Sequence, residues 1–177
     1  MGTDKAFIEV HGVPLWRRQL QTLQQLEPAE ILISGPHRDE WQNANCVVIP
    51  DAEADAGPLA GVAAALRHCT TPLLLTLAID LPNMTTDYLS GLVDSCVGEI
   101  GVIPSDADRC EPVAAVYPKR ALAVAENCLA SRDLSLQRFA ARCVAEGLVK
   151  LKPIAPDERR LFLNMNTPED LLAMTNG

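Results

Sequence analysis

A chain of 177 residues suffices for a single domain that buries most of its apolar surface, and 48% hydrophobic with 21% charged residues argues against both extensive disorder and a membrane protein. The formal net charge of −8 argues against broad attraction to nucleic acid or an anionic membrane surface, and 4% aromatic residues argue against base-stacking single-strand binders. Small nucleotides remain open as ligands if a divalent cation, a helix N-terminus or a few basic residues offset their charge.

The first part of the chain alternates extended and helical patterns. Residues 6–10 (AFIEV) predict a short strand or an extended lead-in, and an amphipathic helix opened by glycine and proline follows over about 12–26. Continuous apolar runs at 30–34 and 46–49 predict strands covered on both faces, as in a parallel sheet.

The middle of the chain holds the most hydrophobic strand candidate. The turn sequence GPLAG (57–61) leads into a helix ending near His68, and the run PLLLTLAI (72–79) predicts a strand that stops at Asp80. We expect this strand to lie at the centre of the sheet. The elements that follow are a helix at about 86–96 and strands at 100–103 and 112–117.

The last part of the chain adds elements of the same kinds. They are helices at about 119–129 and 135–146, a short strand at 148–151 and a final helix that begins near Thr167. Neither a low-complexity linker nor a repeat of fixed period divides the chain. We therefore expect one α/β domain over residues 1–177.

Six scattered cysteines show no CxxC spacing, so we expect buried thiols and no zinc module. The N-terminus does not combine basic residues with an apolar run, and no apolar run is long enough to span a bilayer. The expected location is the cytoplasm.

Trp16 and Trp41 are expected in the core or at an interface. The three histidines are left unassigned, because the sequence around them shows neither a catalytic triad nor a set of metal ligands.

Four positions directly follow apolar runs that read as strands. Ligands bind outside the carboxyl ends of the strands in open parallel sheets, so these positions are the first candidates for a site. They are Ser34 with Gly35, Asp51 after CVVIP, Asp80 after PLLLTLAI, and the segment 164–166 after Leu161-Phe162-Leu163. The topology predicts that they converge.

Asp80 and Asp51 are the acidic candidates. A carboxylate at the end of a buried strand, as at Asp80, can hold Mg²⁺ against phosphate oxygens, but Asp also commonly caps helices and ends strands. Asp51 could lie beside a ribose, a base edge or the metal. Glu53 and Asp55 compete for that role, although a solvated acidic loop accounts for both.

The other candidates carry a cation, amides or glycines. The Lys5 ammonium could neutralise phosphate charge, although a lysine near a terminus is usually solvated. Asn164 and Asn166 offer uncharged donors and acceptors that could orient a ligand. The GPLAG turn (57–61) suits close approach to a ligand and equally the first turn of a helix.

Several of these motifs occur in an order that resembles a known family, the molybdenum cofactor guanylyltransferases. The similar segments are MGTDKAF (1–7), HGVPLWRRQL (11–20), DAEADAGPLAGV (51–62), IDLP (79–82), EPVAAVY (111–117) and NMNTPEDL (164–171). The resemblance covers nearly the whole chain. It implies a three-layer Rossmann-like domain with a mostly parallel sheet and helices on both faces, and Mg²⁺-dependent transfer of GMP from GTP to a molybdopterin-type cofactor with release of pyrophosphate.

The resemblance also implies roles for individual residues. Asp80 would bind Mg²⁺ and the nucleotide phosphates, and Lys5 would contact phosphate, which makes these two the expected catalytic residues. Nucleotide contacts would come from Ser34, Asp51, Gly57, Pro58, Leu59 and Gly61. Asn164 and Asn166 would lie on the pterin side.

The chain departs from the family at its start. In the family, an apolar strand and a glycine-rich loop of the type LAGGxSxR precede the segment that resembles MGTDK, whereas Met1 follows both. The first strand of the sheet and the backbone N–H groups that would cradle the triphosphate are therefore expected to be absent from this chain. The strand edge left unpaired would be an aggregation hazard unless another chain covers it.

Two alternatives follow from these observations. One is a non-catalytic binding or assembly protein that has lost the nucleotide loop, and the other is a related cytidylyl or sugar nucleotidyltransferase. The expected partners are the small-molecule substrates, with a homodimer and molybdoenzyme-maturation proteins as further candidates.

Overall fold

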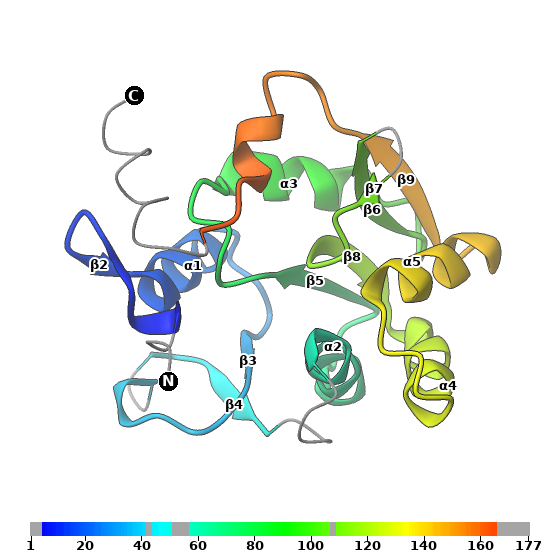
Figure 1. Cartoon of the computed structure of the whole chain (residues 1–177), viewed down its shortest axis with the longest axis horizontal. Helices are drawn as coiled ribbons and strands as arrows, with labels where there is room; N and C mark the ends of the chain where they lie inside the picture. The colour runs from blue at the N-terminus through cyan, green and yellow to red at the C-terminus, as the bar shows by residue number, and fades with distance from the viewer. Residues whose placement is uncertain (1–4, 42–43, 51–56, 107–108, 166–177) are drawn as a thin grey trace.

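The computed structural model describes residues 5–41, 44–50, 57–106 and 109–165. A mixed β-sheet forms the middle layer, with helix α3 (Thr86–Asp94) over one face and α2 (Gly57–His68), α4 (Leu122–Ala130) and α5 (Leu136–Ala145) over the other (Figure 1). The predicted three-layer α/β arrangement is confirmed.

The main sheet is built on strand β8 (Ala114–Pro118). This strand pairs antiparallel with β5 (Leu73–Leu77) on one side and with β6 (Gly101–Asp106) on the other. Beyond β6, the short β7 (Arg109–Cys110) pairs antiparallel and β9 (Val149–Pro153) pairs parallel. Strands β5, β6 and β9 therefore run in one direction, and β8 runs against them because the chain turns back sharply after β6.

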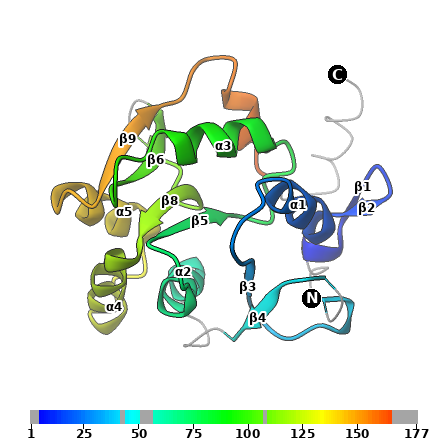
Figure 2. The same ribbon diagram turned by 180° about the vertical axis from the view of Figure 1, so that it is seen from behind.

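Two smaller pairs of strands lie outside the main sheet. Strand β3 (Leu32–Ser34) runs parallel to β4 (Val47–Ile49), and both lie beside helix α1 (Leu15–Gln24), away from β5 to β9 (Figure 2). Strands β1 (Glu9–Val10) and β2 (Val13–Pro14) form a short hairpin before α1.

The prediction that 72–79 forms the central strand is wrong for the described residues. Within them, β5 pairs with β8 alone and so ends the main sheet, and all five of its residues are only half-buried. The physical reason is that hydrophobicity reports how much burial a strand needs, and it does not report how many neighbours the strand has.

The core divides according to the faces of the sheet. On β8, Ala115 and Tyr117 point into a cluster with α2, α4 and α5, and Ala114 and Val116 point into a cluster with α3. This is the alternation of side chains that a strand produces. A third cluster joins α1 to the β3–β4 pair through Trp16, Leu20 and Trp41, so the expectation that both tryptophans are core residues is confirmed.

The remaining predicted elements agree less uniformly. Residues 6–10 divide into a 3-10 turn, η1 (Lys5–Phe7), and β1, and the helix expected from 119 begins as a 3-10 turn, η3 (Lys119–Ala121). Further 3-10 turns are η2 (Asp39–Trp41) and η4 (Arg159–Phe162).

All six cysteines are free thiols. Three of them, Cys69, Cys128 and Cys143, are buried, and the other three, Cys46, Cys96 and Cys110, are half-buried.

The strand assumed at 161–163 is wrong. Leu161 and Phe162 end the turn η4, in which the Leu161 amide donates to the carbonyl of Glu158, and both side chains pack against the α3 cluster. A short apolar run cannot distinguish a strand from a buried turn. The helix expected from Thr167 lies outside the described residues.

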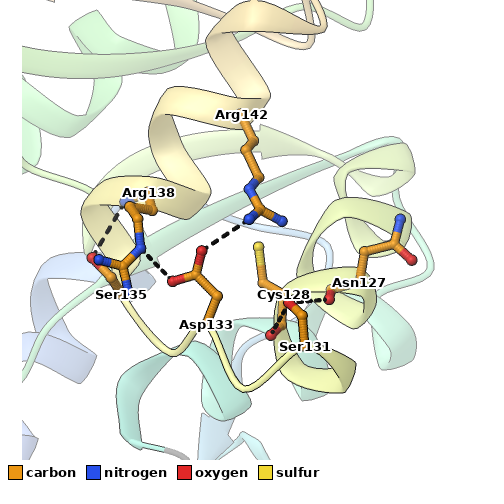
Figure 3. A network of polar contacts seen from close by, with 7 residues as sticks. All are labelled: Asn127, Cys128, Ser131, Asp133, Ser135, Arg138 and Arg142. Atoms are coloured by element: carbon orange, nitrogen blue, oxygen red, sulfur yellow. Dashed lines mark hydrogen bonds and ion pairs between the residues drawn. The ribbon is translucent and has the colours of Figure 1, made fainter.

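The corner between α4 and α5 is held by one carboxylate and two arginines. Asp133 accepts hydrogen bonds from Arg138 Nε and from Arg142 Nη2, the latter at 2.9 Å, and its side chain is 14% exposed (Figure 3). Ser135 caps α5 by accepting from the Arg138 amide. The hydrogen bond from Arg138, with the charges of both arginines, lowers the pKa of the Asp133 carboxyl below its usual value.

Replacing Asp133 with Asn is expected to lower the free energy of unfolding at neutral pH, by an amount that shrinks as the pH falls through the lowered pKa of the folded-state carboxyl. The carboxyl has a lower pKa in the folded protein than in the unfolded chain, where it is about 3.9, so ionised Asp133 stabilises the fold above that value. Its contribution is lost as the pH falls through the folded pKa. Urea unfolding of both proteins across this range measures the difference, and a difference that does not vary with pH would contradict the assignment.

Candidate functional site

A cavity of about 1080 Å³ lies between strands β3 and β5. Residues of α1, including Trp16 and Leu20, and of α2, including Val62, contribute to its lining. Its volume is at the upper end of the range typical of ligand pockets.

The structure brings three of the four predicted strand-end positions to this cavity. Ser34 at the end of β3, Asp80 shortly after β5, and Asn164 after η4 all line it. The predicted convergence is therefore confirmed for these residues, and their roles stay predictions. Asp51 and Asn166 lie outside the described residues.

The backbone on both sides of Asp80 is held by a buried glutamine. Gln19 on α1 is 5% exposed, and its Nε2 donates to the carbonyls of Ala78 at 3.1 Å and Leu81 at 2.8 Å. The carbonyl of Asp80 itself accepts from the Met165 amide at 2.9 Å. Three hydrogen bonds from two distant parts of the chain thus fix this turn, and they leave the Asp80 carboxylate at the cavity wall.

Asp80 is not a helix cap. The N-cap of the following helix, α3, is Thr85, whose hydroxyl accepts from the Tyr88 amide. Asp80 instead faces Lys5, with 3.7 Å between Lys5 Nζ and Asp80 Oδ2, and the two side chains are 44% and 25% exposed. A pair this exposed contributes at most about 1 kcal/mol to stability, so both charged groups are accessible to a ligand at little cost.

The GPLAG turn supplies the first turn of α2. Gly57 has φ +64°, a conformation that side chains other than glycine rarely adopt, and it starts the helix next to the cavity-lining residues Pro58 and Gly61. The N-terminus of a helix carries partial positive charge and free N–H groups, which favours anions. Leu59 is fully buried in the core, so its side chain is not part of the site and only its backbone could contact a ligand.

Sequence reasoning missed several polar residues of the cavity. Glu111 and Arg109 line the cavity. Burial raises the pKa of the Glu111 carboxyl above its usual value, and the nearby positive charge of Arg109 only partly offsets that rise. The only signal for Glu111 was its place at the head of the EPVAAVY segment. Gln19 could have been suspected as a polar residue on the apolar face of an amphipathic helix.

Replacing Gln19 with Leu is expected to lower the free energy of unfolding by about 1–3 kcal/mol, because the carbonyls of Ala78 and Leu81 would lose their buried donor. Urea unfolding of Gln19→Leu measures the change. Gln21→Leu, on the exposed face of the same helix, is the matched control and should stay within about 0.5 kcal/mol of the parent. Equal effects of the two substitutions would show that Gln19 does not hold the Asp80 turn.

The chain is similar to known proteins over nearly its whole length. The profile of a family described as MobA-like NTP transferase domain matches residues 1–146. A protein of Opitutus terrae named as a probable molybdenum cofactor guanylyltransferase is 32% identical over 173 residues, which cover 96% of this chain and 86% of that protein.

Two solved structures share the fold. Molybdopterin-guanine dinucleotide biosynthesis protein A from Archaeoglobus fulgidus superimposes with a TM-score of 0.70 at 24% identity, covering 97% of this chain and 89% of that one. The 2-C-methyl-D-erythritol 4-phosphate cytidylyltransferase from Thermus thermophilus gives 0.74 at 18% identity, with 98% and 94% covered. At these identities the likeness concerns the fold, and it confirms the expected Rossmann-like nucleotidyltransferase class.

Proposed function

We propose that this chain, which belongs to the family of MobA-like NTP transferase domains, transfers GMP from GTP to a molybdopterin-type cofactor and releases pyrophosphate. The single observation that carries the proposal is the meeting of Lys5 and Asp80 at a cavity that also reaches Ser34 and Asn164. The name of the Opitutus terrae relative supports guanine as the base and the molybdenum cofactor as the acceptor.

The reaction requires little covalent chemistry from the protein. An oxygen of the acceptor's terminal phosphate attacks the α-phosphorus of GTP, a new phosphorus–oxygen bond forms, and the bond to the departing pyrophosphate breaks. Such a displacement depends on alignment and on neutralisation of charge, and it needs no protein nucleophile. Lys5 would supply positive charge to the phosphates, and the N-terminal turn of α2 would add its N–H groups.

Asp80 fits a magnesium ion that arrives with the nucleotide. Mg²⁺ keeps several waters and usually binds through one or two carboxylates together with substrate phosphates, which a single half-exposed carboxylate at a cavity wall can satisfy. Within the described ranges, no group of three or more His, Cys, Asp or Glu side chains is placed to hold a metal unaided. When bound, the cation would neutralise charge on the phosphates.

The remaining roles concern binding and orientation. Ser34 and Asp51 would contact the guanosine, and Asn164 and Asn166 would orient the pterin side of the acceptor. The nucleotide would thus lie at the cavity wall formed by the end of β3 and the turn after β5. Cytoplasmic location, a homodimer and contacts with molybdoenzyme-maturation proteins stay predictions. No helix among the described residues is long and apolar enough to cross a membrane.

Cytidylyl transfer is the second candidate, since the Thermus thermophilus enzyme with the same fold is named for it. Incubating the chain with molybdopterin, Mg²⁺ and either GTP or CTP discriminates the two reactions by pyrophosphate release and by the dinucleotide formed. We expect product from GTP. Product from CTP alone would replace guanylyl with cytidylyl transfer, and binding of molybdopterin without turnover of either nucleotide would favour a non-catalytic protein.

Replacing Asp80 with Asn is expected to reduce the rate of pyrophosphate release by about 100-fold or more, the usual effect of removing a group that stabilises charge in the transition state. The Asp157→Asn variant, which changes an exposed carboxylate in the turn after β9, is the matched control and should keep the parent rate. The proposal fails at this residue if Asp80→Asn also keeps the parent rate.

A further inference from the structure

Glu111 is a carboxylate of the cavity wall that has no part in the transfer reaction described above. It lies shortly before β8 and lines the cavity together with Pro112 and Val113. Strand β8 pairs antiparallel with β5, and beyond the end of β5 the Ala78 amide still donates to the Val113 carbonyl at 2.7 Å. Glu111 therefore lies near the turn that carries Asp80, on the side of β5 away from β3 (Figure 1).

The backbone on both sides of Glu111 is fixed by hydrogen bonds. The Glu111 amide donates to the carbonyl of Pro104 on β6 at 2.8 Å, and the Glu111 carbonyl accepts from the Ala114 amide at 3.2 Å. The next carbonyl, that of Pro112, accepts from the buried hydroxyl of Tyr117 at 2.8 Å. Because β6 and β8 hold this segment, the side chain starts from a defined position, as a group that orients a ligand must.

The Glu111 carboxylate accepts no hydrogen bond from the residues that the structure describes. Burial raises its pKa, and the charge of Arg109 offsets only part of the rise. Burial and then the charges of Glu158 and Glu111 raise the pKa of Tyr88 to about 12, yet the buried Tyr88 hydroxyl donates to none of the described residues. A half-buried carboxylate without donors is costly, so a ligand that brings N–H groups to Glu111 would remove this cost.

The two oxygens of a carboxylate match a ligand edge with two adjacent N–H groups, from which they can accept a bidentate pair of hydrogen bonds. The pyrimidinone edge of a pterin presents such a pair, an exocyclic 2-amino group beside a ring N–H. Guanine presents the same pair, so position decides between the two rings. Ser34, which the proposed function places at the guanosine, ends β3, and Glu111 lies beyond β5 from it, with the Asp80 turn between them.

We propose that Glu111 determines specificity for the acceptor, its carboxylate accepting hydrogen bonds from the 2-amino group and the adjacent ring N–H of the pterin. This inference rests on the proposed function, from which it takes the nucleotide at Ser34 and the phosphates at Lys5 and Asp80. The terminal phosphate of the acceptor would then point towards Asp80 and its ring towards Glu111. Glu111 takes part in no covalent step, and its role is to bind and orient the ring.

The test measures equilibrium binding, without turnover, for the parent chain and two variants. Glu111→Gln keeps the size of the side chain but replaces one acceptor oxygen by an amide donor. Glu99→Gln is the matched control, because it changes another carboxylate of the cavity, in the turn before β6. Separate titrations with molybdopterin and with GTP and Mg²⁺ give the two affinities. Displacement of bound molybdopterin by 6-hydroxymethylpterin or by 6-hydroxymethyllumazine, which has oxygen in place of the 2-amino group, gives the preference for that group.

We expect Glu111→Gln to weaken molybdopterin binding by about 10- to 100-fold, the usual effect of losing hydrogen bonds to a charged group, and to change GTP affinity by less than about twofold. The parent chain and Glu99→Gln should bind the pterin about 10-fold more tightly than the lumazine, and Glu111→Gln should lose this preference. A merely structural disturbance would weaken both rings alike and leave the preference intact.

The proposal is overturned if Glu111→Gln binds molybdopterin as the parent does, if it weakens GTP binding instead, or if the parent shows no preference between the two rings. The transfer assay is a separate readout. Pyrophosphate release by a protein in which Glu111→Gln leaves molybdopterin binding unchanged would refute this inference alone. Loss of the ring preference in Glu111→Gln, in a chain that releases no pyrophosphate, would support the pterin contact and refute the transfer reaction.

Discussion

The packing of helix α1 against the β3–β4 pair and against the turn after β5 determines where the protein can bind a ligand. The end of β3 and the turn after β5 come to one cavity, so Ser34 and Asp80 both line it. Gln19 then fixes the backbone around Asp80 from helix α1, and Lys5 approaches the carboxylate to 3.7 Å. The positions of Lys5 and Asp80 therefore depend on the packing of α1 beside the turn after β5.

Stability and chemistry are concentrated in different parts of the molecule. The largest cluster of buried residues among the described ones lies between β8 and helices α2, α4 and α5, with Tyr117 and Phe139 fully buried and their ring centroids 5.2 Å apart. The Asp133 network fixes the loop between α4 and α5 to the first turns of α5. The cavity instead lies against β5, whose residues are half-buried, so its polar groups can contact a ligand without disturbing the main core. Substitutions in the two parts should accordingly be separable by their effects on stability and on transfer.

Sequence patterns predicted those parts of the fold that depend on local periodicity. The helices at α2, α3 and α5 and the strands β3, β4 and β5 agree with the expected segments within a few residues. Pairing depends on distant contacts, which explains why the reversed direction of β8 and the edge position of β5 were not found. The apolar triplet at 161–163 was misread as a strand because a buried 3-10 turn has the same composition.

The site could be predicted in outline and not in detail. Strand-end reasoning pointed to Ser34 and Asp80, which line the cavity at the end of β3 and shortly after β5. Asn164 also lines the cavity, although it follows a 3-10 turn and not a strand. This reasoning could not find Gln19 or Glu111. The buried hydrogen bonds of Gln19 to distant carbonyls and the burial of Glu111 beside the cavity do not produce a periodic pattern in the sequence. The meeting of Lys5 with Asp80 joins positions 75 residues apart (80 minus 5), which only the folded chain displays.

We propose that the Asp80 edge of the cavity binds GTP together with Mg²⁺. Thermal unfolding of this chain with Mg²⁺ and GTP, compared with Mg²⁺ and CTP, tests it most directly, because a ligand that binds only the folded state raises the melting temperature. We expect a rise with GTP that is absent with CTP and is lost in the Asp80→Asn variant. A melting temperature that neither nucleotide changes, or a GTP-induced rise that persists unchanged without the Asp80 carboxylate, would contradict it.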